Sequence, residues 1–187
     1  MRVSLGQRPL IYPQPVLMVA TYDEEGKPDV MTAAWGGVGD DTQVFLCLSA
    51  EHKTTKNILA RKAFTVSMAN EAMLQACDYV GIVSANDDPE KMEKSGFHFT
   101  KAEHVDAPMI NELPLCIECT LISYEPEHCH LFGQIVNTCV DEEFVDDDNA
   151  LEVEALKPLI FSMADGAYYS MGAKIAPAFA AEAPVKK

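Results

Sequence analysis

The sequence lacks the glycine-rich motifs that mark many nucleotide-binding folds. No strand-like segment is followed by Gly-x-Gly-x-x-Gly, and neither Gly-Lys-Ser nor Gly-Lys-Thr occurs. In Rossmann and P-loop proteins these motifs place backbone N–H groups against phosphates. Their absence leaves both folds without support.

Long hydrophobic runs are also missing. The longest apolar runs, such as residues 44–48, have the length of a strand, far short of the roughly 20 residues that a membrane-spanning helix needs. Residues 1–15 contain Arg2 but no apolar core of signal-peptide length, and Pro9 and Pro13 interrupt them. We therefore expect a soluble globular protein of the cytoplasm, with no membrane partner.

Basic residues are scarce. The chain has 14 Lys and Arg against 29 Asp and Glu, a formal net charge of −15 at pH 7. Because such a charge repels polyanions over most of the surface, we exclude nucleic acid as a partner. No Lys or Arg lies between Lys101 and Lys157, whereas acidic residues crowd positions 141–154. This acidic segment is a solvated loop or, alternatively, a docking surface for a basic redox protein.

Without a secretion signal, the six cysteines are expected to be reduced thiols rather than a disulfide framework. Cys116 and Cys119 form Cys-x-x-Cys, and His128, Cys129 and His130 follow, which raises the alternative of a zinc-binding structural module. However, the segment LCIECTLI alternates like a strand. Residues three apart on a strand point to opposite faces, which opposes chelation by this pair. We therefore predict no metal site.

Short alternating segments dominate the chain, as in antiparallel β proteins. We predict strands at residues 16–22, 29–35, 43–48, 63–68, 115–124, 130–140, 158–163 and 167–171, with a hairpin turn at residues 23–27. Residues 63–68 have the pattern of a half-buried strand. Short helices are predicted at residues 71–80 and 88–95, and Thr54 or Thr55 is placed to cap another. The fold class is mainly β, an antiparallel barrel with short inserted helices.

The length of 187 residues suits one domain with a single core. We assign residues 1–187 to one domain, with its core at about residues 13–172. The tail, residues 173–187, is expected to be extended or loosely ordered.

One stretch, residues 30–57, has the composition of a cofactor site. Small residues occupy the end of the second predicted strand, where a flat ligand can lie against the backbone. A polar turn follows the third strand, and hydroxyls, Lys and free N–H groups at a helix start are suited to a phosphate. A basic cluster (Lys53, Lys56, Arg61 and Lys62) lies there in an otherwise acidic chain. A planar ring with a phosphate indicates flavin mononucleotide, FMN. The candidate residues are Thr32, Ala33, Ala34, Trp35, Ser49, Ala50, Lys53, Thr54, Thr55 and Asn57.

Each candidate also has an ordinary structural interpretation. Thr32 is a β-branched strand residue, and the polar turn combines surface polarity with a helix cap. Trp35 is a core residue, a neighbour of the flavin ring or part of a subunit interface. His128 is interpreted as a barrel histidine rather than a base, and no catalytic Ser-His-Asp set is apparent.

Several segments together resemble the flavin reductase-like family, and within it the flavoredoxins. They are PQPVLMVATYDEEGKPDVMTAAW, the turn at residues 49–57, AFTVSMAN, ACDYVGIVSANDDPEKMEKSGF, PMINELPLCIECTL and HCHLFGQIV. The segments occur in the family's order from Pro13 to Gly172. The resemblance implies a Greek-key split barrel that binds FMN and holds NAD(P)H transiently. It also adds Ser84 and Lys91 as cofactor contacts and places main-chain N–H groups of Ala33 and Ala34 at the flavin ring. The alternative is a structural role, in which Ser84 belongs to an N-cap region and Lys91 is a solvated residue of a helix.

The resemblance further implies a homodimer with FMN near the subunit interface. Tyr168, Tyr169, Met171 and residues 175–181 are apolar enough to cover the flavin of a second subunit, or else they pack on their own barrel. We expect an NAD(P)H-dependent flavin reductase or flavoredoxin-like electron transfer through bound FMN. The alternative is an FMN-binding electron carrier or flavin store without enzymatic activity.

Overall fold

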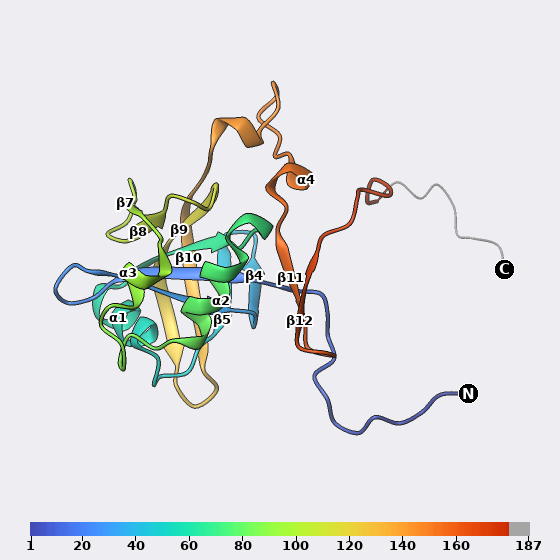
Figure 1. The fold of residues 1–187 in the computed structure, drawn as a ribbon, viewed down its shortest axis with the longest axis horizontal. Coiled ribbons are helices and arrows are strands. Elements are labelled where there is room, and N and C mark those ends of the chain that lie inside the picture. The colour runs from blue at the N-terminus through green and yellow to red at the C-terminus, as the bar shows by residue number, and fades with distance from the viewer. Residues whose placement is uncertain (180–187) are drawn as a thin grey trace.

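A seven-stranded antiparallel sheet, in the order β3-β2-β6-β9-β10-β5-β4, forms the body of the protein (Figure 1). The computed structural model describes residues 1–179. The strands of this sheet are β2 (Leu17–Tyr22), β3 (Pro28–Ala33), β4 (Gly36–Asp40), β5 (Gln43–Cys47), β6 (Ala63–Met68), β9 (Leu115–Glu125) and β10 (His130–Val140). The hairpin turn predicted between the first two long strands lies between β2 and β3.

The two strands at the ends of this order are consecutive in the chain. Only Ala34 and Trp35 lie between β3 and β4, and three residue steps span at most roughly 11 Å. The sheet therefore has to curl until its two edges approach each other. Since the described strands β3 and β4 do not pair, the curled sheet stays open at this point. The predicted mainly β, split-barrel fold is confirmed.

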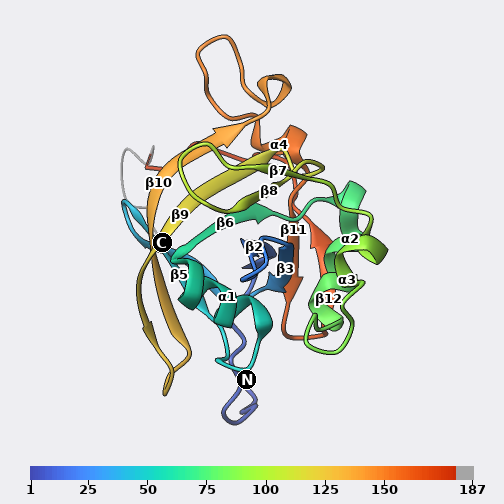
Figure 2. The same ribbon diagram turned by 90° about the vertical axis from the view of Figure 1, so that its left-hand side faces the viewer.

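Two apolar clusters fill the space on either side of the sheet. Inside the barrel, Leu46, Phe64 and Leu131 are fully buried, together with Ile58 of α1 (Lys53–Arg61). Outside, Met18 and other residues of β2 and β3 pack against α2 (Leu74–Ile82). Figure 2 shows α1 at one end of the barrel, with α2 and α3 (Lys91–Ser95) together beside it.

Smaller elements complete the fold. A second sheet, in the order β1-β11-β12, contains β1 (Gln14–Pro15), β11 (Leu159–Ser162) and β12 (Ala167–Ser170). The hairpin of β7 (Phe99–Lys101) and β8 (Pro108–Ile110) covers part of the main sheet, and α4 (Val153–Leu156) lies in the acidic segment. Short 3₁₀ helices occur at Glu71–Met73 and Glu142–Phe144. No helix within residues 1–179 is long and apolar enough to cross a membrane. Of the predicted tail, residues 180–187 lie outside the described residues.

The structure has four short strands that were not predicted, β1, β4, β7 and β8, and it corrects the burial of β6. β4 was not predicted, because Gly36-Gly37-Val38-Gly39 has the composition of a turn. Position 36 requires glycine because the backbone of β5 lies too close for a side chain: an added Cβ would lie 2.8 Å from the carbonyl oxygen of Phe45. β6 was predicted as half-buried but is buried on both faces, because residues 102–107 cover its outer side. Thr65 on that side donates a hydrogen bond to the carbonyl oxygen of Pro108 at 2.6 Å.

The helix predictions also change in detail. Neither Thr54 nor Thr55 caps α1, which begins at Lys53 with His52 at its N-cap and no side-chain cap. The helix predicted from residue 88 begins at Lys91, because the N–H groups of Asp87 and Asp88 turn back to the carbonyl of Ser84.

Gly133→Ala tests the packing inside the barrel. An added Cβ would overlap the ring of the buried Phe64 and lie 3.1 Å from Cγ2 of Val44. We expect the free energy of unfolding to fall by about 1–3 kcal/mol, the usual cost of overpacking. The measurement is the urea unfolding midpoint at an unchanged slope. Gly37→Ala on β4 is the matched control, since nothing lies within 4 Å of its added Cβ. Equal midpoints for the two variants would contradict this account.

Candidate functional site

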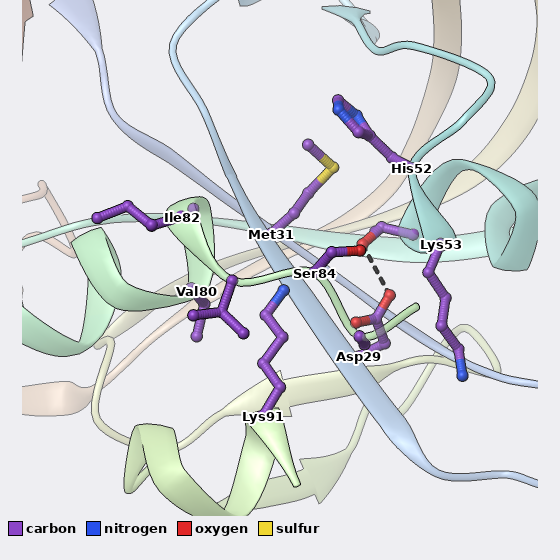
Figure 3. A pocket seen from close by; sticks show the side chains of 12 residues that line it. Asp29, Met31, His52, Lys53, Val80, Ile82, Ser84 and Lys91 are labelled. Atoms are coloured by element: carbon purple, nitrogen blue, oxygen red, sulfur yellow. Dashed lines mark hydrogen bonds between the residues drawn. The ribbon is translucent and has the colours of Figure 1, made fainter. Parts of the chain in front are cut away.

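A cavity of about 180 Å³ lies along the free edge of β3 (Figure 3). Residues from β3, the start of α1, the end of α2 and the start of α3 surround it. The lining residues are Asp29, Met31, His52, Lys53, Thr54, Val80, Gly81, Ile82, Val83, Ser84, Ala85 and Lys91. The site is therefore assembled where three helices meet an edge strand.

A buried carboxylate ties α1 to β3. Asp29 is only 2% exposed, and its Oδ2 accepts hydrogen bonds from Thr54 Oγ1 at 2.7 Å and Asn57 Nδ2 at 3.3 Å. Its other oxygen, Oδ1, is buried without a hydrogen-bond partner among the described residues. The carboxylate is thus left with one acceptor that no described residue satisfies.

Lys91 turns inward toward the same strand. Its side chain is buried, and Nζ donates a hydrogen bond to the carbonyl oxygen of Val30 at 2.6 Å. Burial lowers the pKa of this ammonium, and the neighbouring Asp29 carboxylate partly offsets the effect. Within residues 1–179 its other N–H bonds have no hydrogen-bond acceptor. Lys91 therefore covers the edge of β3 and retains donors at the cavity.

The Val30 carbonyl also defines the direction of the backbone groups on β3. Residues of an antiparallel strand alternate in the side to which they direct N–H and C=O. Val30 and Thr32 therefore direct these groups to the free edge, whereas Ala33 directs its own toward Leu17, its partner on β2.

The N-terminus of α1 presents uncapped backbone donors to the cavity. His52 makes no side-chain cap, and the first turn contains no acidic residue. First-turn N–H groups have no acceptor within the helix and carry the positive end of its dipole. Lys53 lies at the same place, with Nζ 3.5 Å from Asp23 Oδ2. Burial opposes ionisation of Asp23, but the N–H groups of Lys27 and Glu25, with Lys53, lower the pKa of its carboxyl.

The opposite side of the cavity is apolar. In Figure 3, Val80 and Ile82 lie on one side and Lys53 on the other, with Asp29, Ser84 and Lys91 between them. Ile82 is 75% exposed although it is a large apolar residue. The loop after α2 is tied to the loop before α1, since Asn86 Nδ2 donates to the carbonyl oxygen of Glu51 at 3.2 Å. The cavity therefore combines anion-binding donors with an apolar wall.

Comparison with known proteins identifies the family. A family model described as "Flavin reductase like domain" matches residues 9–171. The chain belongs to this family.

Solved structures agree with the assignment. The chain is similar to flavoredoxin of Desulfovibrio vulgaris (Miyazaki F), with 36% identity, a TM-score of 0.92 and coverage of 97% of this chain and 99% of that one. Flavoredoxin from Methanosarcina acetivorans is 25% identical, with a TM-score of 0.84 and 96% of each chain covered. An FMN-binding domain of a flavin reductases-like enzyme from Shewanella baltica OS155 shares the fold, at 22% identity, a TM-score of 0.74 and coverage of 88% and 89%.

Only part of the sequence-predicted set lines this cavity of the flavin reductase-like fold. Lys53, Thr54, Ser84 and Lys91 line it directly. Asn57 does not line the cavity but donates a hydrogen bond to Asp29, which does. Ser49 and Ala50 lie in the loop that leads into α1. Of the predicted basic cluster only Lys53 lines the cavity. Lys53, Lys56 and Arg61 each pair with a carboxylate, of Asp23, Glu51 and Asp106 respectively.

The predicted contacts on and after β3 are placed differently. The Thr32 hydroxyl donates to the carbonyl of Cys77 on α2 and so does not point freely to a ligand. The Ala33 N–H is directed into the sheet, which does not support its predicted contact with a flavin ring. Ala34 follows the strand without lining the cavity. Trp35 is 50% exposed and lines a separate cavity with Phe45 and His130, so it is not a core residue.

Sequence analysis missed Asp29, Met31, His52, Val80 and Ile82 as lining residues. Asp29 was placed at the start of a strand, and the apolar residues follow ordinary strand or helix spacing. A carboxylate at the first position of a buried strand was the available signal, because a buried charge needs partners.

The zinc-binding module receives no support from the described part of the chain. Within residues 1–179, no group of three or more His, Cys, Asp or Glu side chains is arranged to hold a metal ion. Cys119 is buried in the interior cluster, whereas Cys116 lines a cavity on the outer side of the sheet. The two sulfur atoms therefore lie on opposite faces, as strand alternation predicts.

Two neighbouring threonines test the link between α1 and β3. Thr54 and Thr55 are both buried, but only the Thr54 hydroxyl bonds to Asp29, and Thr55 Oγ1 has no partner among the described residues. Thr54→Val should lower the free energy of unfolding by about 1.5–3 kcal/mol, the range for a hydrogen bond to a charged group. Thr55→Val should leave it unchanged or raise it slightly. Urea unfolding measures both, and an equal loss in the two variants would contradict the assignment.

Proposed function

We propose that this chain binds FMN in the cavity beside β3 and acts as an oxidoreductase through the bound flavin. The observation that carries the proposal is the meeting of uncapped α1 donors with an apolar wall in one cavity of a flavin reductase-like fold. Its similarity to two flavoredoxins supports the same function.

The donors at the start of α1 suit the phosphate of FMN. A helix N-terminus without an acidic residue attracts an anion through its free N–H groups and its dipole. Lys53 adds a positive charge at this position. Ser84 and Lys91 supply further polar groups in the cavity, so the residues present fit the phosphate end of the cofactor.

The Asp29 carboxylate suits a different part of the cofactor. An ionised carboxylate only accepts hydrogen bonds and repels phosphate. Its unpartnered Oδ1 matches a donor such as a hydroxyl of the ribityl chain or an N–H of the ring. The phosphate is therefore assigned to the Lys53 side of the cavity.

The size of the cavity limits what it can enclose. Pockets that bury most of a small ligand usually measure about 300–1,000 Å³, and this cavity measures about 180 Å³. It can hold only part of FMN. The apolar residues Met31, Val80 and Ile82 at its wall offer a surface on which the flat ring can rest.

We further propose a homodimer in which a second copy covers the exposed part of the flavin. Figure 1 shows the two terminal segments extending away from the barrel. They expose large apolar residues: Ile11, Tyr12, Phe179 and Ile175, the last at 99% exposure. Among the residues predicted to cover the flavin of a second subunit, Tyr169 and Met171 are exposed. Tyr168 instead packs on its own barrel, where its hydroxyl donates a hydrogen bond to Asp78. Residues 180 and 181 lie outside the described residues. Light scattering should give twice the 20.5 kDa chain mass; tight FMN binding by a monomer would overturn this proposal.

No acid–base residue is required for the proposed reaction. When bound, FMN supplies the redox chemistry by accepting hydride or electrons in its ring. The residues of the chain orient the cofactor and exclude water. A nicotinamide cofactor is proposed as a transient partner that stacks on the exposed ring face, which accounts for the missing dinucleotide-binding motif.

The visible spectrum and rapid mixing test this function. The purified protein, or the protein reconstituted with FMN, should be yellow and should quench flavin fluorescence. Prompt bleaching of the flavin band by NADH or NADPH in stopped flow identifies a reductase. Bleaching only by dithionite or by a protein donor identifies the electron carrier or flavin store, which the acidic segment also suits. Failure to bind FMN would overturn both functions.

Lys53→Ala tests the position of the phosphate. Because a hydrogen bond to a charged group contributes about 1.5–3 kcal/mol, the variant should bind FMN at least about tenfold more weakly. Fluorescence titration at moderate salt measures the Kd. Lys56→Ala is the control, since Lys56 lies on the same helix, is more exposed and does not line the cavity. An unchanged Kd for Lys53→Ala would show that the phosphate lies elsewhere.

A further inference from the structure

A second cavity, of about 320 Å³, brings three sulfur atoms together on the outer side of the sheet. Cys116 on β9, Cys139 on β10 and Met109 on β8 all line it. β8 packs against β2 and β6 of the main sheet, and Met109 reaches from it to Cys139 on β10. This cavity shares no lining residue with the flavin cavity.

The register of the sheet places the two cysteines directly opposite each other. Cys139 pairs with Cys116 in the β9–β10 ladder, and side chains of such a pair lie on one face with Cβ atoms roughly 4.5–5.5 Å apart. The two thiols can therefore act on one ligand together.

The third sulfur lies at a distance suited to a shared ion. Cys139 Sγ is 3.8 Å from Met109 Sδ. Two sulfurs that each lie about 2.3 Å from one metal ion, in trigonal or tetrahedral geometry, are separated by roughly 3.8–4.0 Å. Two thiols and a thioether form a soft donor set, of the kind that binds Cu(I), zinc or iron–sulfur clusters.

We infer that Cys116, Cys139 and Met109 form a binding site for a soft monovalent cation, Cu(I). Each cysteine that binds exchanges its S–H bond for an S–Cu bond and releases one proton to solvent, with no change in oxidation state. Asp141 also lines the cavity, and nearby carboxylates favour a cation there. None of the residues that line this cavity is Lys or Arg.

The donor set favours this assignment over two others. Zinc sites use thiolate, imidazole and carboxylate ligands, whereas the third donor here is a thioether. A dithiol that exchanges disulfides needs an accessible thiolate. Cys116 is only 4% exposed, so its thiol is shielded from a disulfide partner in solution. Neither zinc storage nor disulfide exchange matches these properties.

The test is an anaerobic titration of the reduced full-length chain with Cu(I) against the colorimetric chelator bicinchoninate. The wild-type protein should withdraw one equivalent of Cu(I), with or without FMN. Cys139→Ser and the volume-conserving Met109→Leu should each weaken binding at least about tenfold, the lower range seen when even an outer-shell partner is lost. Cys47→Ser is the control, because Cys47 lies on β5 and lines another cavity. Circular dichroism confirms that the variants are folded.

Three outcomes would overturn the site. The first is a wild-type chain that withdraws no Cu(I). The second is loss of binding in Cys47→Ser with full retention in Cys139→Ser and Met109→Leu. The third is a reduced chain that binds no Cu(I) and that, after treatment with glutathione disulfide, forms a Cys116–Cys139 disulfide detected by peptide mass spectrometry. Because the titration is run with and without FMN, its result is separate from that of the proposed flavin function.

Discussion

The free edge of β3 is the constraint on which the functional part of this structure depends. An edge strand presents unpaired backbone groups that must be covered. The two-residue link to β4 holds this edge beside the opening of the barrel, so a further strand does not cover it. Three helices meet there instead, and the Lys91 ammonium satisfies the Val30 carbonyl. The cavity proposed to bind FMN is a consequence of how this edge is covered.

Each covering element contributes a different chemistry. The start of α1 contributes free N–H groups, α2 contributes apolar side chains, and α3 contributes a buried ammonium. Asp29 connects these parts, because its carboxylate accepts hydrogen bonds from α1 and its charge lies close to Lys91. Since a buried carboxylate is costly without partners, α1 is held firmly in place. The polar and apolar halves of the cavity therefore remain in one arrangement.

The same barrel carries a second, chemically unrelated group of residues on β8, β9 and β10. Oxygen and nitrogen donors surround the cavity beside β3, whereas sulfur atoms surround the cavity under the β7–β8 hairpin. The hairpin is held to β6 by the bond from Thr65 to Pro108. Covering the outer face of β6 thus has two effects, because it buries that strand on both sides and brings Met109 over the paired cysteines.

The mainly β class, most of the long strands and the polar segment that leads into α1 could be predicted from the sequence alone. These features depend on period-two alternation and on turn composition, which are local properties of the chain. Three features are visible only in the folded structure: Lys91 turns inward, the Thr32 hydroxyl bonds to α2, and Asp29 is part of the site. The folded structure also decided that Cys116 faces Cys139 rather than acting with Cys119. Strand register and helix placement arise from contacts between distant segments, and local patterns do not specify such contacts.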